Sequence, residues 1–503
     1  MGQTLRTPEP GRPRWRSWFE RVRAGELRTG LQDAAPVAVA GLLVNGASVV
    51  VVVVVARLVT SREYGAIAQL LGLFFILSMP GSAVVVGVVR RVTAWRSQGR
   101  LALVPAWAHR VHRLLVIAIV VELVVVVATQ HWLARLIGLP SDQGILAILM
   151  AGGLWILLCV DRGLLQSDRA YRPLASNLLL EGVVRTAGIV VLVAAGLGVS
   201  GYALGVLVGE ILAVTHARWL VRRRTAIGAA TPEDAGSATP DEAPPDGGRR
   251  QLVIDVSVAF TALGLLAVLQ NIDVIVLGRY NHVDEGSYAA ISVAAKALVF
   301  GALALGAYLL PEATIRWHAG GHAVRQLGVT LLLLAVPAGG LLGAALVDPR
   351  GFLALFFSPR LTVAAPAFAT LVGAMIFLGV SVLLTNYLIG VGTRWVVAVL
   401  GLGAVVAAGA MVVAHGSLVG TARADLAVQS AVCLALAITF VIVHHRRHGA
   451  RWKAQFGTVL PGWAWRGPWT PVGAGTEPPV GSVPAATLSL GEGGARTSRD
   501  EHR

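Results

Sequence analysis

The chain has 503 residues, of which 55% are hydrophobic and only 14% are charged. Soluble globular proteins carry about 25% charged residues, so this chain has too little charge to cover its apolar surface as a set of soluble domains. The apolar residues form blocks of roughly twenty residues separated by Arg-rich segments, which is typical of helices that span a bilayer. Composition therefore predicts an all-α polytopic membrane protein and excludes a largely disordered chain.

The formal charge is +15, from 42 Lys and Arg against 27 Asp and Glu. These basic residues flank the apolar blocks instead of forming one patch, so they indicate orientation in a membrane and not nucleic-acid binding. The two cysteines, Cys159 and Cys433, lie inside apolar runs, which excludes a disulfide framework.

The first half of the chain begins with an Arg-rich tail, residues 1–34, and its first apolar run starts too late for a signal peptide. Residues 35–221 are predicted to form a first lobe of six transmembrane helices. The six predicted spans are Ala35–Ala56, Gly65–Val88, Leu114–Ala134, Gly144–Asp161, Leu174–Val199 and Gly201–Val221.

Residues 222–250 are rich in Pro, Gly, Ala and acidic residues, which predicts a disordered linker. Residues 251–444 form the predicted second lobe, and residues 445–503 a disordered tail. The predicted spans of the second lobe are Leu252–Gly278, Ser287–Ala313, Leu327–Leu346, Ala364–Ile389, Trp395–His415 and Leu426–His444.

Arginine counting predicts the orientation of these twelve helices. With a cytoplasmic N-terminus, the inside segments carry 29 Lys and Arg and the outside segments carry 7. Because cytoplasmic loops are enriched in basic residues, both termini and the linker are expected in the cytoplasm, and the protein in the cell membrane.

The two halves resemble each other in sequence. Arg57 precedes Glu63-Tyr64-Gly65 at the second predicted helix, and Arg279 precedes Glu285-Gly286-Ser287-Tyr288 at the eighth. Two six-helix halves would form a parallel pseudo-repeat, and transporters often bind their substrate between such halves.

Ionisable residues inside predicted spans are costly in lipid and need a partner, a cavity or a function. Asp273 and Lys296 lie roughly 8 and 15 Å from the same end of neighbouring helices, a difference that a lysine stem can bridge. The pair is interpreted either as lining a transport path or as a fixed structural ion pair.

Glu181 and Arg185 lie one turn apart on the fifth predicted helix and can form an ion pair. Glu122 on the third helix and Glu210 on the sixth are further candidates to reach Arg185. An intramembrane ion-pair network that stabilises the first lobe is the favoured interpretation.

Arginines at the cytoplasmic ends of helices 2 and 4 are candidates to bind phosphate, because the guanidinium group matches phosphate oxygens. Orientation in the membrane is the favoured role for any single one of them. They are Arg90, Arg91, Arg162, Arg169 and Arg172.

Sequence motifs for enzymes are absent: the chain has no GxxxxGK[ST] loop, no HExxH and no GxSxG. No catalysis, cofactor or metal site is expected, and histidines such as His109 and His112 are interpreted as residues of the membrane interface. The Pro80-Gly81 pair is expected to interrupt the second helix.

In these features the chain resembles the oligosaccharide flippases of the multidrug/oligosaccharidyl-lipid/polysaccharide exporter superfamily, over about residues 35–444. The features that carry the resemblance lie at helix ends and in helix interiors, in the same order along the chain. They are Arg57 with Glu63-Tyr64-Gly65, Arg90-Arg91, Arg162-Gly163-Leu164-Leu165-Gln166, Glu181-Gly182 with Arg185, Gly201-Tyr202, Asp273, Tyr288 and Pro311.

The resemblance implies two lobes in the V shape of multidrug exporters, with a cavity lined by helices 1, 2, 7 and 8. It implies alternating-access transfer of a polyprenyl-diphosphate-linked oligosaccharide from the inner to the outer leaflet, with glycan polymerase or assembly enzymes as partners. The residues that it assigns to binding or transport are Asn45, Arg90, Arg91, Asn271, Asp273 and Lys296.

Two alternatives stay open at this point. A cation-coupled multidrug or metabolite antiporter has the same fold, although the first predicted helix, Ala35–Ala56, lacks the acidic residue that many drug-exporting relatives carry. A non-transporting membrane scaffold for glycan-assembly enzymes would instead use the Arg-rich tails.

Overall fold

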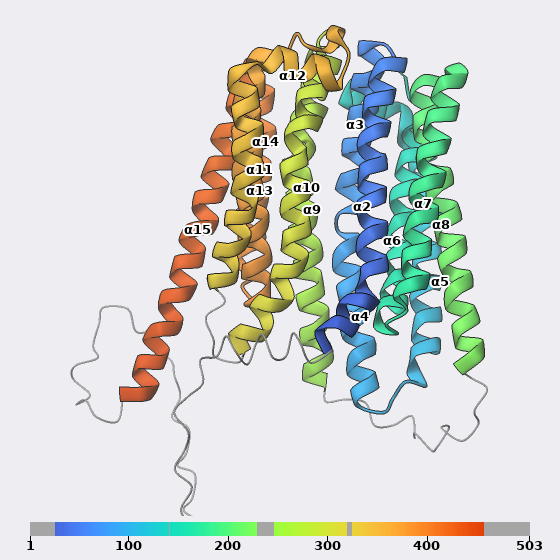
Figure 1. Ribbon diagram of the computed structural model, residues 1–503, viewed down its shortest axis with the longest axis vertical. Coiled ribbons are helices and arrows are strands. Elements are labelled where there is room, and N and C mark those ends of the chain that lie inside the picture. Colours follow the sequence, from blue (N-terminus) through green and yellow to red (C-terminus); the bar gives the residue numbers. More distant parts are fainter. Residues whose placement is uncertain (1–25, 140, 229–245, 319–323, 457–503) are drawn as a thin grey trace, which may run out of the picture. The chain divides into compact units, whose positions relative to one another are not determined.

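The computed structural model describes residues 26–139, 141–228, 246–318 and 324–456. The predicted tails at 1–25 and 457–503 and the centre of the linker, 229–245, lie outside the described residues. The chain divides into two compact units, Met1–Val443 and His444–Arg503, and the first of them holds every candidate site described below. Throughout the described residues the secondary structure is helical, without strands (Figure 1).

Helices of the first half follow the predicted order closely. The α3 helix begins with a capping box, in which Thr60 accepts from the Glu63 backbone N–H and Glu63 accepts from Thr60 N–H. The helices are α2 (Glu26–Leu58), α3 (Ser61–Ser78), α4 (Gly81–Ser97), α5 (Leu103–Ile137), α6 (Ile145–Ser167), α7 (Tyr171–Leu192) and α8 (Gly198–Gly228).

Helices of the second half include one short element that was predicted as a loop. This is α12 (Pro349–Phe356), where Asp348 caps the helix by accepting from the Gly351 N–H. The others are α9 (Asp246–Tyr280), α10 (Glu285–His318), α11 (Val324–Val347), α13 (Ala365–Gly390), α14 (Trp395–Val413) and α15 (Leu418–Phe456).

The described residues contain eleven stretches long and apolar enough to span a membrane. One of them, Tyr171–Arg224, has 54 residues, about 80 Å of helix, which exceeds a hydrocarbon core of about 30 Å. The left-handed backbone at Gly196 and Gly198, with φ of 88° and 50°, turns the chain there, and α7 packs along α8. This stretch therefore crosses twice, which agrees with the predicted twelve crossings.

Pro80 interrupts the second membrane span, as predicted. The α3 helix ends at Ser78 and α4 begins at Gly81, because proline lacks the N–H that an α-helix needs at this position. Around the break the backbone uses tighter bonds, from Ser82 N–H to Met79 O and from Ala83 N–H to Pro80 O. The two helices still form one continuous span, Ser61–Arg96.

Several helices extend beyond the predicted spans. The α8 helix continues to Gly228 and α9 begins at Asp246, so helix replaces both ends of the predicted linker. The α15 helix likewise continues to Phe456, into the predicted tail. Backbone hydrogen bonding continues where the apolar run ends, because a helix needs no lipid to form.

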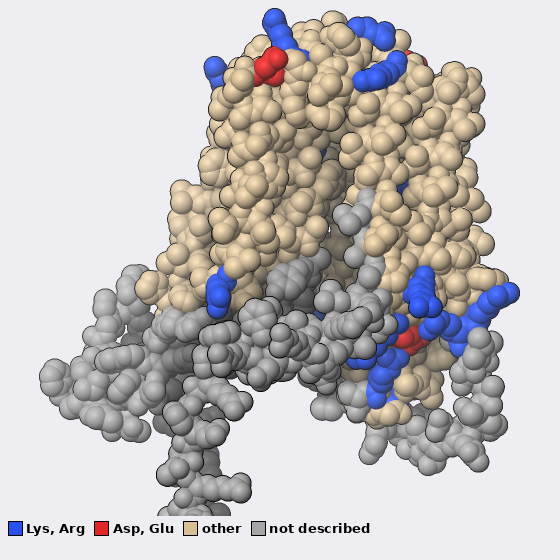
Figure 2. Space-filling view, in the orientation of Figure 1, with Lys and Arg blue, Asp and Glu red and all other residues tan. Residues whose placement is uncertain are grey.

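Most helices pack against other helices of the same half of the sequence. The α7 helix packs against α2 and α8, and α10 packs against α13, whereas contact between the halves comes mainly from α3 against α9 and α10. The α5 helix is the most exposed span, with only 11% of its apolar window buried. Figure 2 shows Lys and Arg at the two ends of the described surface and an uncharged band between them, as expected for a surface that meets lipid.

Candidate functional site

The predicted ion pair of Asp273 and Lys296 is present on α9 and α10. Lys296 Nζ lies 3.3 Å from Asp273 Oδ1 and 3.4 Å from the side-chain oxygen of Asn271. Ser292 donates to the other Asp273 oxygen at 3.1 Å. Asp273 is fully buried and Lys296 is 6% exposed, so the pair is shielded from both water and lipid.

Two further polar residues from α15, Asp425 and Gln429, join this site, and both are fully buried. Gln429 donates to Asp425 Oδ1 and to the Leu269 carbonyl of α9, at 3.1 and 3.0 Å. The Asp273 carboxylate and the Lys296 ammonium lie within electrostatic reach of Asp425. We call this group the acid–lysine cluster, and it consists of Asn271, Asp273, Ser292, Lys296, Asp425 and Gln429.

Sequence analysis missed Asp425 because the last predicted span began at Leu426. The observed helix begins at Leu418, so Asp425 lies two turns inside it. The apolar and small residues between Leu418 and Ala422 were the signal that the span starts earlier.

A second buried network connects α6, α7 and α8 in the first half. Glu181 pairs with Arg162 at 2.6 Å and with Arg185 at 2.5 Å, and Arg185 lies 3.8 Å from Glu210. Arg162 also donates to the side-chain oxygen of Asn177 at 2.9 Å. The predicted Glu181–Arg185 pair is therefore present, and we call this group the arginine–glutamate network.

Glu122, a member of the predicted network, and Arg162, a predicted phosphate ligand, are both placed differently. Glu122 on α5 is half-buried against Gly153, and no ion pair joins it to Arg185 among the described residues. Arg162 was predicted at the cytoplasmic mouth as a phosphate ligand, yet it is 6% exposed and bound to Glu181. The reason is that α6 continues to Ser167, which keeps Arg162 inside the bundle.

The interpretation of His112 as an interface residue was wrong. His112 of α5 is 5% exposed, and its Nε2 lies 2.9 Å from Asp161 Oδ1 of α6. Arg218 of α8 lies 3.6 Å from the same oxygen. These three residues add a polar link between α5, α6 and α8, next to the arginine–glutamate network.

The other predicted binding residues do not meet these clusters. Arg90 and Asn45 are exposed on α4 and α2. The Arg91 guanidinium lies over the Trp95 ring at 4.5 Å, a cation–π contact that orients it. Arg169 and Arg172 are exposed near the same end of the first half, so a role in phosphate binding stays a prediction for these arginines.

Reciprocal hydrogen bonds join the two halves at their predicted outer ends. Arg279, after the seventh span, donates to the carbonyls of Arg135 and Leu136 at 2.7 and 2.6 Å. Arg57, after the first span, donates to the Leu355 carbonyl at 3.2 Å. Each arginine thus reaches from one half to the other: Arg279 to the last turn of the third span, and Arg57 to α12, which follows the corresponding span of the second half, as expected for a parallel pseudo-repeat. We call these bonds the outer arginine contacts.

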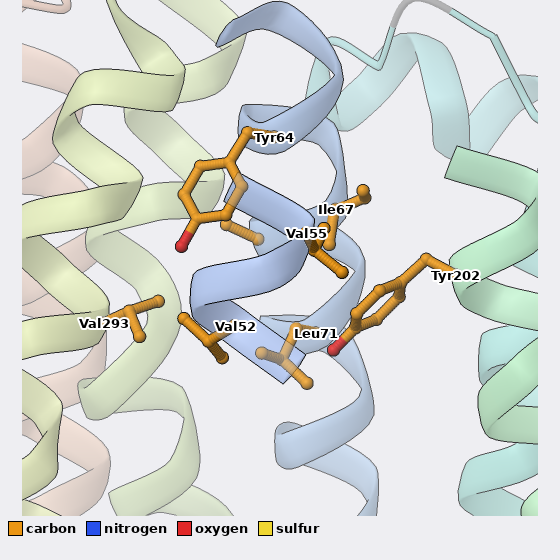
Figure 3. Close-up of a pocket in the computed structure, with 8 residues that line it drawn as sticks. Val52, Val55, Tyr64, Ile67, Leu71, Tyr202 and Val293 are labelled. Carbon is orange, nitrogen blue, oxygen red and sulfur yellow. The ribbon is translucent and has the colours of Figure 1, made fainter. Parts of the chain in front are cut away.

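A small apolar pocket lies near the outer arginine contacts. Figure 3 shows Val52 and Val55 of α2, Tyr64 of α3 and Tyr202 of α8 around it, with Val293 of α10 on the opposite side. Mostly apolar side chains line it, so it does not suit a sugar or a phosphate. Further along the same face, Figure 2 shows a hollow between the parts that Figure 1 labels α10 and α2.

Within the described residues, no group of three or more His, Cys, Asp or Glu is placed to hold a metal ion. Both cysteines are free and buried.

Comparison with known proteins identifies the fold. No family model matches the chain, and no curated protein matches it. Among solved structures, it is similar to the lipid II flippase MurJ in an inward closed conformation, with a TM-score of 0.59 and 13% identity over 80% of this chain and 87% of that one.

Drug transporters share the same architecture. An inward-facing multidrug resistance MATE family transporter of the MOP superfamily matches with a TM-score of 0.57 and 14% identity, over 79% of this chain and 95% of that one. A point mutant of the Vibrio cholerae MATE transporter VcmN matches with a TM-score of 0.52 and 14% identity, over 81% and 95%. The chain thus has the all-helical fold of MurJ and the MATE transporters, and identities this low establish the fold alone.

Proposed function

We propose that this chain is a membrane flippase that moves a polyprenyl-diphosphate-linked oligosaccharide from the inner to the outer leaflet by alternating access. The observation that carries the proposal is the fold shared with the lipid II flippase MurJ across 80% of the chain. A lipid-linked saccharide needs a polar path between two halves and an apolar surface for its tail. The proposal places the saccharide in the hollow between α10 and α2 that Figure 2 shows, and the tail against the uncharged outer surface beside it.

The outer arginine contacts support the alternating-access part of the proposal. They close the halves against each other at the predicted outer ends through a few hydrogen bonds from exposed arginines. Bonds of this kind can break and form again as the halves move, whereas the buried networks inside each half hold that half together.

A cation-coupled antiporter for drugs or metabolites is the second candidate, because MATE transporters match nearly as well, with a TM-score of 0.57. The membrane span of α2, Val39–Leu58, contains no acidic residue, which favours the flippase. Under the first proposal the cell membrane is the expected site of action, and glycan polymerase or assembly enzymes are the expected partners.

The test uses a strain that lacks this chain, in which polyprenyl-linked oligosaccharide is extracted and labelled from outside in intact spheroplasts. The proposal expects full-length lipid-linked product that accumulates and that the external probe does not reach. Wild-type chain should restore labelling, and an Asp273→Asn variant of equal abundance should not. Normal labelling in the deletion strain, together with resistance to drugs on overexpression, would favour the antiporter.

A further inference from the structure

The acid–lysine cluster carries more negative than positive charge. Asp273 and Lys296 compensate each other as an ion pair, but no cation of the described chain lies within hydrogen-bonding distance of Asp425. Asp425 is fully buried, and its Oδ2 atom has no hydrogen-bond partner among the described residues. A buried carboxylate without a partner costs several kcal/mol, so such a group takes up a proton instead.

The described helices around Asp425 supply no other group that provides the missing positive charge. Asp273 approaches from α9, and Lys296 and Tyr288 approach from α10. The α13 and α14 helices contain no charged residue. On α15 itself, Arg423 is exposed and Cys433 lies two turns further along.

Position along the helices brings the two carboxyl groups to the same depth. Asp273 lies seven residues before the end of α9 at Tyr280, and Asp425 lies seven residues after the start of α15 at Leu418, about 10 Å in each case. Both helix ends are on the same side, since Asn281 donates to the Gly416 carbonyl just before α15. Two carboxyl groups therefore lie at one level of the bundle, and the Lys296 ammonium is paired with one of them, Asp273.

We propose that Asp273 and Asp425 together hold one exchangeable proton beside Lys296, so that the acid–lysine cluster is a proton-binding site. The charge of the cluster is then zero with the proton bound. When the proton leaves, a net negative charge remains inside the second half, which favours any conformation that brings water or a cation to it. This inference deepens the proposed function, on which it rests, by naming protons as the ions that drive transport.

A metal cation fits the cluster less well than a proton. Hard cations take six or more oxygen ligands, whereas Asp425 and Gln429 each offer one oxygen without a partner in the described structure. Lys296 already occupies the side of Asp273 that a cation would approach, with Nζ 3.3 Å from Oδ1.

The test is infrared spectroscopy of the purified full-length chain in lipid nanodiscs, which resolves the C=O stretch of a protonated carboxylic acid from that of a carboxylate. Relative to the wild type, Asp425→Asn is expected to lose one protonated-acid band. Asp273→Asn is expected to lose the same band, because Lys296 then neutralises Asp425. Lys296→Met is expected to gain a second band, since both acids then need a proton.

The control is Asp348→Asn, which changes an exposed helix cap and should leave the band intact. If neither Asp variant removes a band, or if Lys296→Met adds none, the proposal is overturned. A band that sodium chloride removes at constant pH would overturn it in favour of a metal cation. The measurement needs no transport substrate, so its failure is distinguishable from failure of the flippase proposal.

Discussion

The two halves of this chain differ in how their buried charged residues are paired. In the first half, the arginine–glutamate network sets two arginines against two glutamates, and Glu181 contacts both arginines. In the second half, the acid–lysine cluster sets one lysine against two aspartates. The first arrangement is electrically complete, whereas the second depends on an additional positive charge.

Under the proposed function, this difference assigns a structural role to the arginine–glutamate network and a role in transport to the acid–lysine cluster. A network whose charges balance, with Glu181 bonded to both arginines, stabilises the bundle of α6, α7 and α8, although the Glu210 carboxylate accepts no hydrogen bond from the described residues. An unbalanced cluster can gain or lose a positive charge when its surroundings change, and a transport cycle needs a group of this kind. The second half is therefore expected to change during transport while the first half moves as a rigid body.

The largest effect is expected from Glu181→Gln, which leaves Arg162 and Arg185 buried without their shared carboxylate. Removing one partner of a buried pair costs about 3–5 kcal/mol, so the variant should unfold at a clearly lower temperature in detergent. Glu122→Gln is the matched control, because Glu122 is half-buried without an ion pair in the described structure. Equal unfolding temperatures for the two variants would contradict the structural role of the network.

A smaller loss of stability but a complete loss of transport is expected from Asp273→Asn. The amide oxygen can still accept from Lys296, and the amide NH2 group can donate to the Ser292 hydroxyl, so the folding cost should be about 1–3 kcal/mol. Unfolding temperature and spheroplast labelling, measured on the same preparation, check the two parts of this prediction. A stable variant with normal transport would show that Asp273 and Lys296 form only a structural ion pair.

Arg279→Gln should weaken the outer arginine contacts by about 1–2 kcal/mol, which changes the balance of conformations roughly 5–30-fold. Spin labels at exposed Trp132 of α5 and Val283, beyond α9, should report longer distances in the variant. Arg57→Gln is expected to act in the same direction, and the double variant more strongly. Unchanged distances in the double variant would show that these bonds do not hold the halves together.

The smallest effects concern two corresponding turns, Gly196 after α7 and Gly416 before α15. Both have left-handed backbone, with φ of 88° and 75°, so alanine costs about 1 kcal/mol at either site. At Gly416 an added Cβ would also lie 2.9 Å from Tyr280 Cβ, whereas at Gly196 nothing described lies within 4 Å. In thermal unfolding, Gly416→Ala should therefore have a lower unfolding temperature than Gly196→Ala.

Features that depend on composition and short-range geometry were predictable from the sequence. Apolar block length predicted twelve crossings, because the bilayer thickness sets the number of residues per helix. The Glu181–Arg185 pair followed from the spacing of one helical turn. The Asp273–Lys296 pair followed from matching depths on consecutive helices, and the break at Pro80 from the chemistry of proline.

The composition of the buried charged sites depended on where the helices end and on which of their sides face one another. The predicted spans stopped at charged residues, short of the observed ends of α6 and α15, so Arg162 and Asp425 were left outside the predicted helices although both are buried. The Asp161–His112 contact between α5 and α6 likewise depends on how each helix is rotated about its own axis. The position of an apolar run in the sequence does not predict that rotation. By itself, then, the sequence determined the membrane class, the crossings and the local ion pairs. Only the tertiary structure decided which charges share a site, because long-range contacts depend on the packing of the whole bundle.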